Sequence, residues 1–206
     1  MTQPTEILEA GLAGMGIPLE PARTEQLMAY LGELAQWNRS YNLTAVREIR
    51  DMVPRHLLDS LALLGFLQGD RFIDIGSGAG LPGLPLAVAS PGSHFTLLDS
   101  NGKKTRFLRH VVRTLGLANI DVVQARAEEF RPENGYDAAL ARAVAPPATL
   151  MASVEHLVLP GGKLLAMIGR DEPPPADTAS WRWSRTKTLQ VPGETGQRHL
   201  MIFEHL

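Results

Sequence analysis

The sequence predicts an α/β fold in which a doubly wound, mostly parallel sheet follows a group of N-terminal helices. From residue 69 onward, short apolar runs of buried-strand type alternate with segments of helical character. This alternation is typical of a parallel sheet with helices on both faces. The first apolar run leads into the glycine-rich stretch "FIDIGSGAGLPGLP", residues 72–85, which marks the first strand-to-helix turn of many nucleotide-binding α/β folds.

The N-terminal third of the chain is predicted to be helical. Leu27, Leu31 and Leu34 recur at helical spacing, which indicates one apolar helix face. We expect three or four helices between residues 5 and 67. They are interrupted at 38–51 by "NRSYNLTAVREIRD", which is polar, rich in cap-forming residues and predicted to be a loop with a short helical turn.

The remainder of the chain supplies the strands. We assign residues 1–68 to a helical cap and 69–206 to the main domain, and we expect one compact unit because 206 residues suit a single domain. The predicted strands of the parallel sheet are "RFIDI" (71–75), "HFTLLD" (94–99), "IDVVQA" (120–125), "YDAALA" (136–141) and "KLLAMI" (163–168).

Helices and a hairpin complete the predicted order. The segments 103–116 and 148–160 have helical character and connect strands. At the end of the chain, two strand-like runs at 181–191 and 197–206 flank a turn at 192–196. This pattern predicts an antiparallel hairpin that closes one edge of the sheet.

The composition excludes several classes of protein. The chain has no cysteine, so it has no disulfide, thiolate metal site, thiol nucleophile or cysteine-held iron–sulfur cluster. We assign no metal site. No stretch reaches the roughly 18 apolar residues of a membrane span, and the N-terminus lacks a signal-peptide pattern, so we expect a cytoplasmic protein and a monomer. The net charge of −2 argues against a uniformly basic nucleic-acid binder but not against a local basic patch.

The glycine stretch allows two interpretations. Gly78, Gly80 and Gly83 match the dinucleotide pattern G-x-G-x-x-G, which is a weak signal on its own. Alternatively, Asp74 and Gly76 begin a D-x-G-x-G-x-G pattern with an acid at the end of the strand. A carboxylate at the mouth of the loop would repel a pyrophosphate but attract an ammonium or a sulfonium. The second interpretation therefore favours S-adenosylmethionine over a dinucleotide.

Acidic residues also end the next two predicted strands. Asp99 closes the second strand, where a carboxylate can accept hydrogen bonds from ribose hydroxyls in either cofactor. Ala127 and Glu128 follow the third strand, where a backbone amide and a carboxylate could hold an adenine edge. A helix start with acids in its first turn explains the same two residues equally well.

Taken with these features, the chain resembles the family of bacterial ribosomal RNA small-subunit methyltransferase G (RsmG, older name GidB). The resemblance spans about residues 41–200. The matching stretches are "YNLTAV", "RHLLDSL", "FIDIGSGAGLPGLPLA", "FTLLDSNGKKTRFL", "ARAEEF", "ARAVAP", "LPGGKLLAM" and "RHL". It implies a Rossmann-like class I methyltransferase fold and methylation of N7 of a guanine in 16S ribosomal RNA, free or in a precursor of the small subunit, with S-adenosylmethionine.

The resemblance also implies site residues. It places cofactor contacts at Gly76 and Leu81 in the loop, at Ala127 and Glu128 after the third strand, and at Arg142 after the fourth. The complete candidate set for the cofactor is Asp74, Gly76, Gly78, Leu81, Asp99, Ala127, Glu128 and Arg142.

Two departures from the family pattern concern the RNA. Ile168 stands where such proteins usually carry a lysine, and Glu204 and His205 stand where another lysine is common. RNA contacts assigned to those lysines do not carry over to this chain.

The expected chemistry needs no general base. Guanine N7 already presents a lone pair, so no proton leaves before an in-line attack on the methyl group, and we name no catalytic residue. His56 in "RHLLDS" is interpreted as a structural or RNA-facing group. The enzyme then contributes orientation and exclusion of water.

Local basic clusters offer RNA contacts despite the net charge. A run of basic residues along a helix is more commonly explained as a solvated helix face. Trp181 and Trp183 could stack on RNA bases or pack at the edge of the sheet. The cations concerned are Lys103, Lys104, Arg106, Arg109 and Arg113 in one predicted helix, and Arg182, Arg185, Lys187 and Arg198 in the hairpin.

Three other functions stay open at this point. A nicotinamide-dependent oxidoreductase would use Gly78, Gly80 and Gly83, a methyltransferase could act on another RNA or on a small molecule, and a binding protein could keep the fold without turnover.

Overall fold

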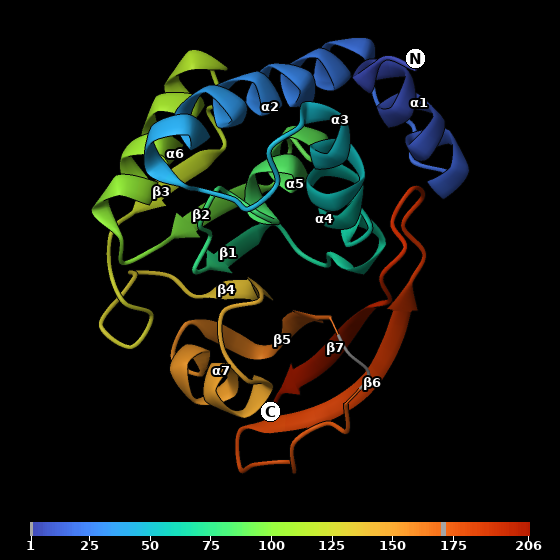
Figure 1. Ribbon diagram of the computed structural model, residues 1–206. Coiled ribbons are helices and arrows are strands. Elements are labelled where there is room, and N and C mark those ends of the chain that lie inside the picture. Colours follow the sequence, from blue (N-terminus) through green and yellow to red (C-terminus); the bar gives the residue numbers. More distant parts are fainter. Residues whose placement is uncertain (1, 170–171) are drawn as a thin grey trace.

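The computed structural model describes residues 2–169 and 172–206. N-terminal helices precede alternating strands and helices, as Figure 1 shows. In chain order the elements are α1 (Pro4–Met15), α2 (Pro21–Tyr41), α3 (Ile49–Met52), the π-helix η1 (Val53–Leu58), α4 (Asp59–Leu61), the 3₁₀ turn η2 (Leu64–Phe66), β1 (Arg71–Ile75), α5 (Gly83–Ala89), β2 (His94–Leu98), α6 (Gly102–Thr114), β3 (Ile120–Val123), β4 (Tyr136–Arg142), α7 (Pro147–Val154), β5 (Val158–Ile168), β6 (Trp181–Leu189) and β7 (Arg198–His205). Within the ranges described, no helix has both the length and the apolar character needed to span a membrane.

The strands form one seven-stranded sheet in the order β3-β2-β1-β4-β5-β7-β6. The first five of these strands pair in parallel, whereas β7 runs antiparallel to both β5 and β6. The predicted doubly wound sheet and its terminal hairpin are therefore confirmed, with β6 at the edge. The strand order reverses between β1 and β4, and ligands of such sheets bind beyond the carboxyl ends of the strands at this point.

Helices cover the two faces of the sheet unequally (Figure 1). On one face, α1, α2, η1, α4, α5 and α6 bury their leucines in a core that includes Phe72 and Phe95. On the other face, α7 and Trp181 pack over Ile73 and Ile75. Successive strand residues thus point into different cores, because side chains alternate along a strand. Both faces are buried, as expected for parallel strands that are apolar throughout.

The N-terminal helices share their core with the sheet. Leu27, Leu31 and Leu34 are fully buried, so the predicted apolar face of α2 is confirmed. The same cluster contains strand residues, and burying each leucine contributes about 1.5–3 kcal/mol. α2 continues through Tyr41, into the segment predicted to be a loop, and ends where Asn42 adopts φ 49°, a left-handed conformation that asparagine tolerates well.

Two segments differ from the sequence-based prediction. Residues 53–66 form a π-helix, a short α-helix and a 3₁₀ turn in place of one regular helix. The predicted helix 148–160 ends at Val154, and β5 already begins at Val158. Tyr136 of β4 pairs with Val158, and its N–H donates to the carbonyl of Leu157 over 2.8 Å. Pairing with β4 therefore overrides the local helical pattern.

Candidate functional site

A hollow of about 340 Å³ lies at the carboxyl edge of the sheet, where the strand order reverses. Its walls are the segments that follow β1, β2, β3 and β4, together with the first turns of α7. Four of the predicted site residues line it: Gly76, Asp99, Ala127 and Glu128. Its volume lies within the usual range for small-molecule sites, roughly 300–1,000 Å³.

The loop after β1 depends on glycine conformations. Gly76, Gly78 and Gly80 have φ angles of 61°, 60° and 98°, a region that side chains with a Cβ rarely adopt. Ser77 fastens the loop to the neighbouring strand, because its N–H donates to the carbonyl of Leu98 over 3.0 Å. The loop is therefore held close to the end of β2.

Side chains from distant segments also fix this loop. A Cβ at Gly76 would lie 2.9 Å from a methyl carbon of Val144, which follows β4. From α2, the hydroxyl of the buried Tyr30 donates to the carbonyl of Ala79 over 2.9 Å. The N-terminal helices thus support the loop directly.

Asp99 is the hydrogen-bonding centre of the hollow. Its Oδ2 accepts from the N–H of Gly78 at 2.9 Å and from Nζ of Lys104 at 3.5 Å, and its Oδ1 accepts from the N–H of Asn101 at 2.8 Å. A carboxylate offers about four lone-pair sites. Asp99 is therefore preorganised and still has capacity to accept a bond from a ligand hydroxyl.

Asp74 takes a different position from the one expected at the mouth of the loop. The side chain is fully buried, and its Oδ2 accepts from the N–H of Gly83 at the start of α5, over 2.9 Å. Desolvation raises the pKa of Asp74 to about 7. Oδ1 has no hydrogen-bond partner among residues 2–169 and 172–206. A fully buried carboxyl that is only about half ionised at pH 7 does not present its charge at the mouth of the loop, and its contact with Gly83 makes Asp74 part of the loop's support.

The other loop and strand-end residues differ in exposure. Leu81 is buried in the core beneath the loop and does not line the hollow. After β3, Ala127 is buried and Glu128 is exposed. The carbonyl of Glu128 accepts from Nη1 of Arg131 over 2.7 Å, which leaves the carboxylate of Glu128 available to a ligand.

Arg142 lies at the end of β4 but does not line the hollow. Its Nη1 contacts Oδ2 of the buried Asp59 at 2.7 Å, and the other oxygen of Asp59 lies 3.2 Å from Nε of Arg198. Burial raises the pKa of Asp59, and the two guanidinium groups oppose that shift. Arg142 therefore forms a salt bridge with a partner 83 residues away.

His56 belongs to the same cluster. It is buried in η1, and desolvation lowers its pKa to about 4, so the ring is neutral near pH 7. Nη2 of Arg142 lies 3.4 Å from Nδ1, and a guanidinium can only donate. The other ring nitrogen, Nε2, lies 2.9 Å from Oγ1 of Thr44. This arrangement supports the structural interpretation of His56.

Sequence reasoning missed several residues of the site. In the sequence Lys104 stands out only as part of a basic run, whereas in the structure it lines the hollow and contacts Asp99. Asp59 lies in the stretch "RHLLDS", and nothing in the neighbouring sequence indicates that it pairs with Arg142 and Arg198. The remaining unpredicted lining residues come from strand ends and from α7, and they include Ser100, Arg126, Val144, Thr149 and Ser153.

Comparison with known proteins finds one family model and close relatives that match most of the chain. A family model described as "rRNA small subunit methyltransferase G" matches residues 23–201. The protein named "Ribosomal RNA small subunit methyltransferase G" from Nitrosococcus oceani is 47% identical over 197 residues, which are 95% of this chain and 92% of that protein. The protein of the same name from Ectopseudomonas mendocina is 47% identical over 204 residues, 96% of this chain and 94% of that protein.

Solved structures agree with the fold. The mitomycin 7-O-methyltransferase MmcR aligns with a TM-score of 0.58 and 17% identity over 99% of this chain and 74% of that chain. The N-methyltransferase NodS from Bradyrhizobium japonicum, in complex with S-adenosyl-L-homocysteine, aligns with a TM-score of 0.55 and 16% identity over 85% of this chain and 97% of that chain. The fold is that of class I S-adenosylmethionine-dependent methyltransferases.

Proposed function

The chain belongs to the ribosomal RNA small subunit methyltransferase G family, and from this premise we propose that it methylates N7 of one guanine in 16S ribosomal RNA, with S-adenosylmethionine as methyl donor. The observation that carries the proposal is the family match over residues 23–201, which includes the glycine loop and every segment that lines the hollow. Family membership leaves the nicotinamide oxidoreductase without support.

The chemistry of the hollow fits S-adenosylmethionine. This molecule has a zwitterionic amino-acid end, a sulfonium, a ribose and an adenine, and no phosphate. Asp99 has acceptor capacity for a ribose hydroxyl, and Ala127 and Glu128 stand where they can meet the adenine. Lys104 and Arg126 also line the hollow, so the lining offers both signs of charge to the amino-acid end.

The remaining predicted residues receive different roles. At Gly78 a Cβ would make only ordinary contacts, with the carbonyl oxygen of Gly76 at 3.8 Å and Nζ of Lys104 at 4.0 Å, so we assign this glycine to the left-handed turn at φ 60°. Leu81 supports the loop from the core, and Asp74 holds the start of α5 against it. Arg142 is held by Asp59, and we assign it to the substrate side of the site.

Bound S-adenosylmethionine supplies an activated methyl group on a positively charged sulfur. The guanine N7 lone pair forms the new N–C bond as the C–S bond breaks, so the positive charge moves from sulfur to the base and no proton is removed. The protein therefore needs no general base, and the neutral, buried His56 need not act as one. Orientation and exclusion of water can lower the barrier by about 7–11 kcal/mol when the geometry is ideal.

The wider context is part of the proposal. We infer that the partner is 16S ribosomal RNA within the small subunit or its precursor, and that the enzyme works as a cytoplasmic monomer. The cap of residues 1–68 and the domain of residues 69–206 would move as one unit, since they share a core and Tyr30 bonds to the loop.

The direct test is methyl transfer from labelled S-adenosylmethionine to small subunits purified from a strain that lacks this activity. We expect N7-methylguanine at one position, which can be mapped by chemical cleavage and primer extension. Subunits from the parent strain serve as the control, because their guanine is already methylated and they should take up no label.

Calorimetry separates the alternatives. We expect S-adenosylmethionine to bind and NAD not to bind. Binding without label transfer to any RNA would favour a binding protein, and methylation of a different base or of a small molecule would contradict the proposed substrate.

A further inference from the structure

The outward side of α6 carries a concentrated positive charge. Lys103, Arg106, Arg109 and Arg113 are all exposed, and at about 100° per residue their side chains fall within a sector of about 120°. The helix sequence "GKKTRFLRHVVRT" contains no acidic residue. We call these four residues the α6 basic face. Because the whole chain has a net charge of −2, this concentration is not a consequence of overall composition.

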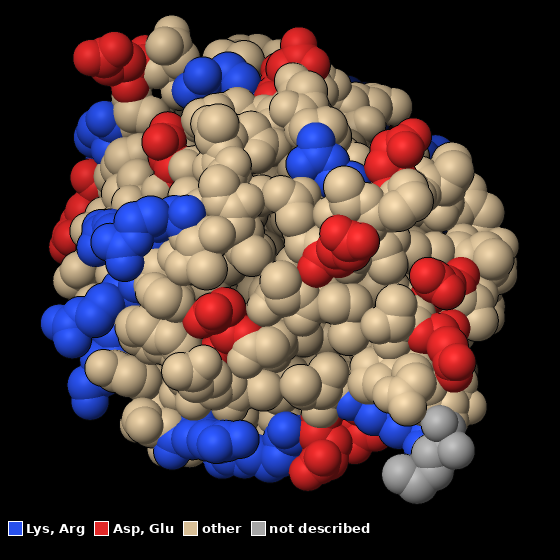
Figure 2. Space-filling model, turned by 90° about the horizontal axis from the view of Figure 1, so that it is seen from above, with Lys and Arg blue, Asp and Glu red and all other residues tan. Residues whose placement is uncertain are grey.

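The charges of the α6 basic face are not neutralised within the part of the chain that the structure describes. Ion pairs on the same helix involve Lys104, which contacts Asp99, and His110, which contacts Glu33, but none of the four residues of the face. Figure 2, which looks down on the molecule from above, shows several Lys and Arg side chains along the left and lower margins, with some Asp and Glu side chains among them. A cluster of unpaired, exposed cations produces a field that attracts polyanions.

Aromatic rings lie beside these cations. A hollow of about 600 Å³ is lined by Trp37 of α2 and by Arg106, Arg109 and Arg113 of α6. Trp37 stacks on Tyr41 with ring centroids 5.2 Å apart. The half-buried Trp37 thus stands beside three arginines, a combination that suits a single-stranded nucleic acid, because bases stack on aromatic rings and phosphates contact cations.

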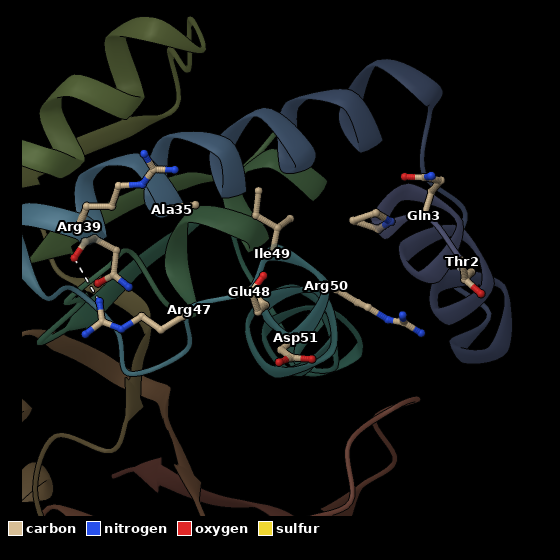
Figure 3. A pocket seen from close by; sticks show the side chains of 11 residues that line it. Thr2, Gln3, Ala35, Arg39, Arg47, Glu48, Ile49, Arg50 and Asp51 are labelled. Atoms are coloured by element: carbon tan, nitrogen blue, oxygen red, sulfur yellow. Dashed lines mark hydrogen bonds between the residues drawn. The ribbon is translucent and has the colours of Figure 1, made fainter.

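Further cations lie around the carboxyl end of α2 and the start of α3, where Glu48 and Asp51 also line the surface. A second hollow, of about 670 Å³, includes Arg39, Arg47 and Arg50 in its lining. Figure 3 shows Arg39 and Arg47 near the end of α2 and Arg50 pointing toward the start of α1. Arg47 is fixed by the carbonyl of Asn38 at 3.3 Å. On the other side, α6 itself reaches the cofactor hollow through Lys104.

We propose that the α6 basic face and the carboxyl end of α2 form the surface that holds the phosphate backbone of the ribosomal RNA next to the target guanine. This inference rests on the proposed function and specifies how its substrate is held. It assigns RNA contacts to a helix face present in this chain, and it does not require a lysine at Ile168.

The hairpin offers a matched control for the test. The first variant carries Lys103→Gln, Arg106→Gln and Arg113→Gln on the α6 basic face. The control carries Arg182→Gln, Arg185→Gln and Lys187→Gln on the edge strand β6. Each removes two arginines and one lysine, all six side chains are exposed, and none of the six forms an ion pair with any residue that the structure describes.

We expect the α6 variant to raise the KM for small subunits roughly tenfold, as the loss of three exposed charge contacts allows. Its kcat and its affinity for S-adenosylmethionine should stay unchanged. The slope of log K against log salt for RNA binding should become shallower by about 2, because each lost phosphate contact on a single strand contributes about 0.7. The hairpin variant tests the other basic cluster named from the sequence, and the inference requires that it lose clearly less than the α6 variant in KM and in RNA binding.

The outcomes separate this inference from the proposed function. If the wild type does not methylate subunits, the proposed function fails. If the wild type is active and the α6 variant equals it, or if the control loses as much, the α6 surface is wrong. A loss on subunits without weaker binding to protein-free 16S RNA would indicate an acidic protein partner and would also overturn the inference. The single variant Arg106→Gln repeats the test with less risk to folding.

Discussion

Replacing Asp74 with asparagine removes a titrating group from the interior and keeps its shape. The asparagine oxygen can still accept from the N–H of Gly83, which lies 2.9 Å from Oδ2 in the wild type. In the folded protein, burial raises the pKa of Asp74 from 3.8 to about 7. Folding therefore favours the protonated form. Its contribution to stability is fully present below about pH 3.8 and is lost as the pH rises through about 7.

The magnitude follows from these two pKa values. With one pKa unit equal to about 1.36 kcal/mol, the contribution of Asp74 is about 2 kcal/mol at about pH 5.5 and close to zero at about pH 8.5. The asparagine variant has no such titration. The free energy of unfolding of the variant, relative to the wild type, should therefore rise by about 2 kcal/mol between these two pH values.

Urea unfolding of both proteins across this pH range measures the difference. His56 titrates in both proteins, so its contribution cancels as long as the two sites are independent. A difference in unfolding free energy that stays constant with pH would refute the reasoning, because it would mean that Asp74 is ionised throughout. A changed urea slope would instead indicate an altered unfolded state.

Three further substitutions test the other contacts of the site. Tyr30→Phe leaves the carbonyl of Ala79 without its donor at 2.9 Å, so thermal unfolding should show a loss of about 1–3 kcal/mol. Asp99→Asn removes the charge from a carboxylate that lines the hollow, so calorimetry should show S-adenosylmethionine binding about 10- to 100-fold weaker, which corresponds to one charged hydrogen bond. Asp59→Asn leaves Arg142 without its counter-charge at 2.7 Å, so unfolding should cost about 3 kcal/mol less.

A specific outcome would contradict each of these three predictions. Unchanged stability in Tyr30→Phe would mean that water replaces the hydroxyl at the loop. Unchanged cofactor affinity in Asp99→Asn would place the ribose elsewhere. An Asp59→Asn protein as stable as the wild type would mean that solvent screens the pair, since the side chain of Arg142 is 22% exposed.

Much of the fold could be predicted because its signals are local. The alternation of apolar runs and helical segments follows from the periods of strands and helices, and the structure confirms the parallel sheet, the hairpin and the apolar face of α2. The π-helix at Val53–Leu58 could not be predicted from periodicity. The early start of β5 depends on the pairing of Val158 with Tyr136. This contact cannot be inferred from residues 154–160 alone.

The features of the candidate site also fall into those that could be predicted from the sequence and those that could not. The sequence by itself determined the glycine loop, the position of Asp99 at a strand end and the family, because these depend on residue order and on the fixed direction of parallel strands. Only the tertiary structure decided that Asp74 faces α5, that Arg142 pairs with Asp59, and that α7 closes the hollow. The physical reason is that the direction of a side chain and the charge it carries depend on burial and on partners far away in the chain, and neither is present until the helices pack on the sheet.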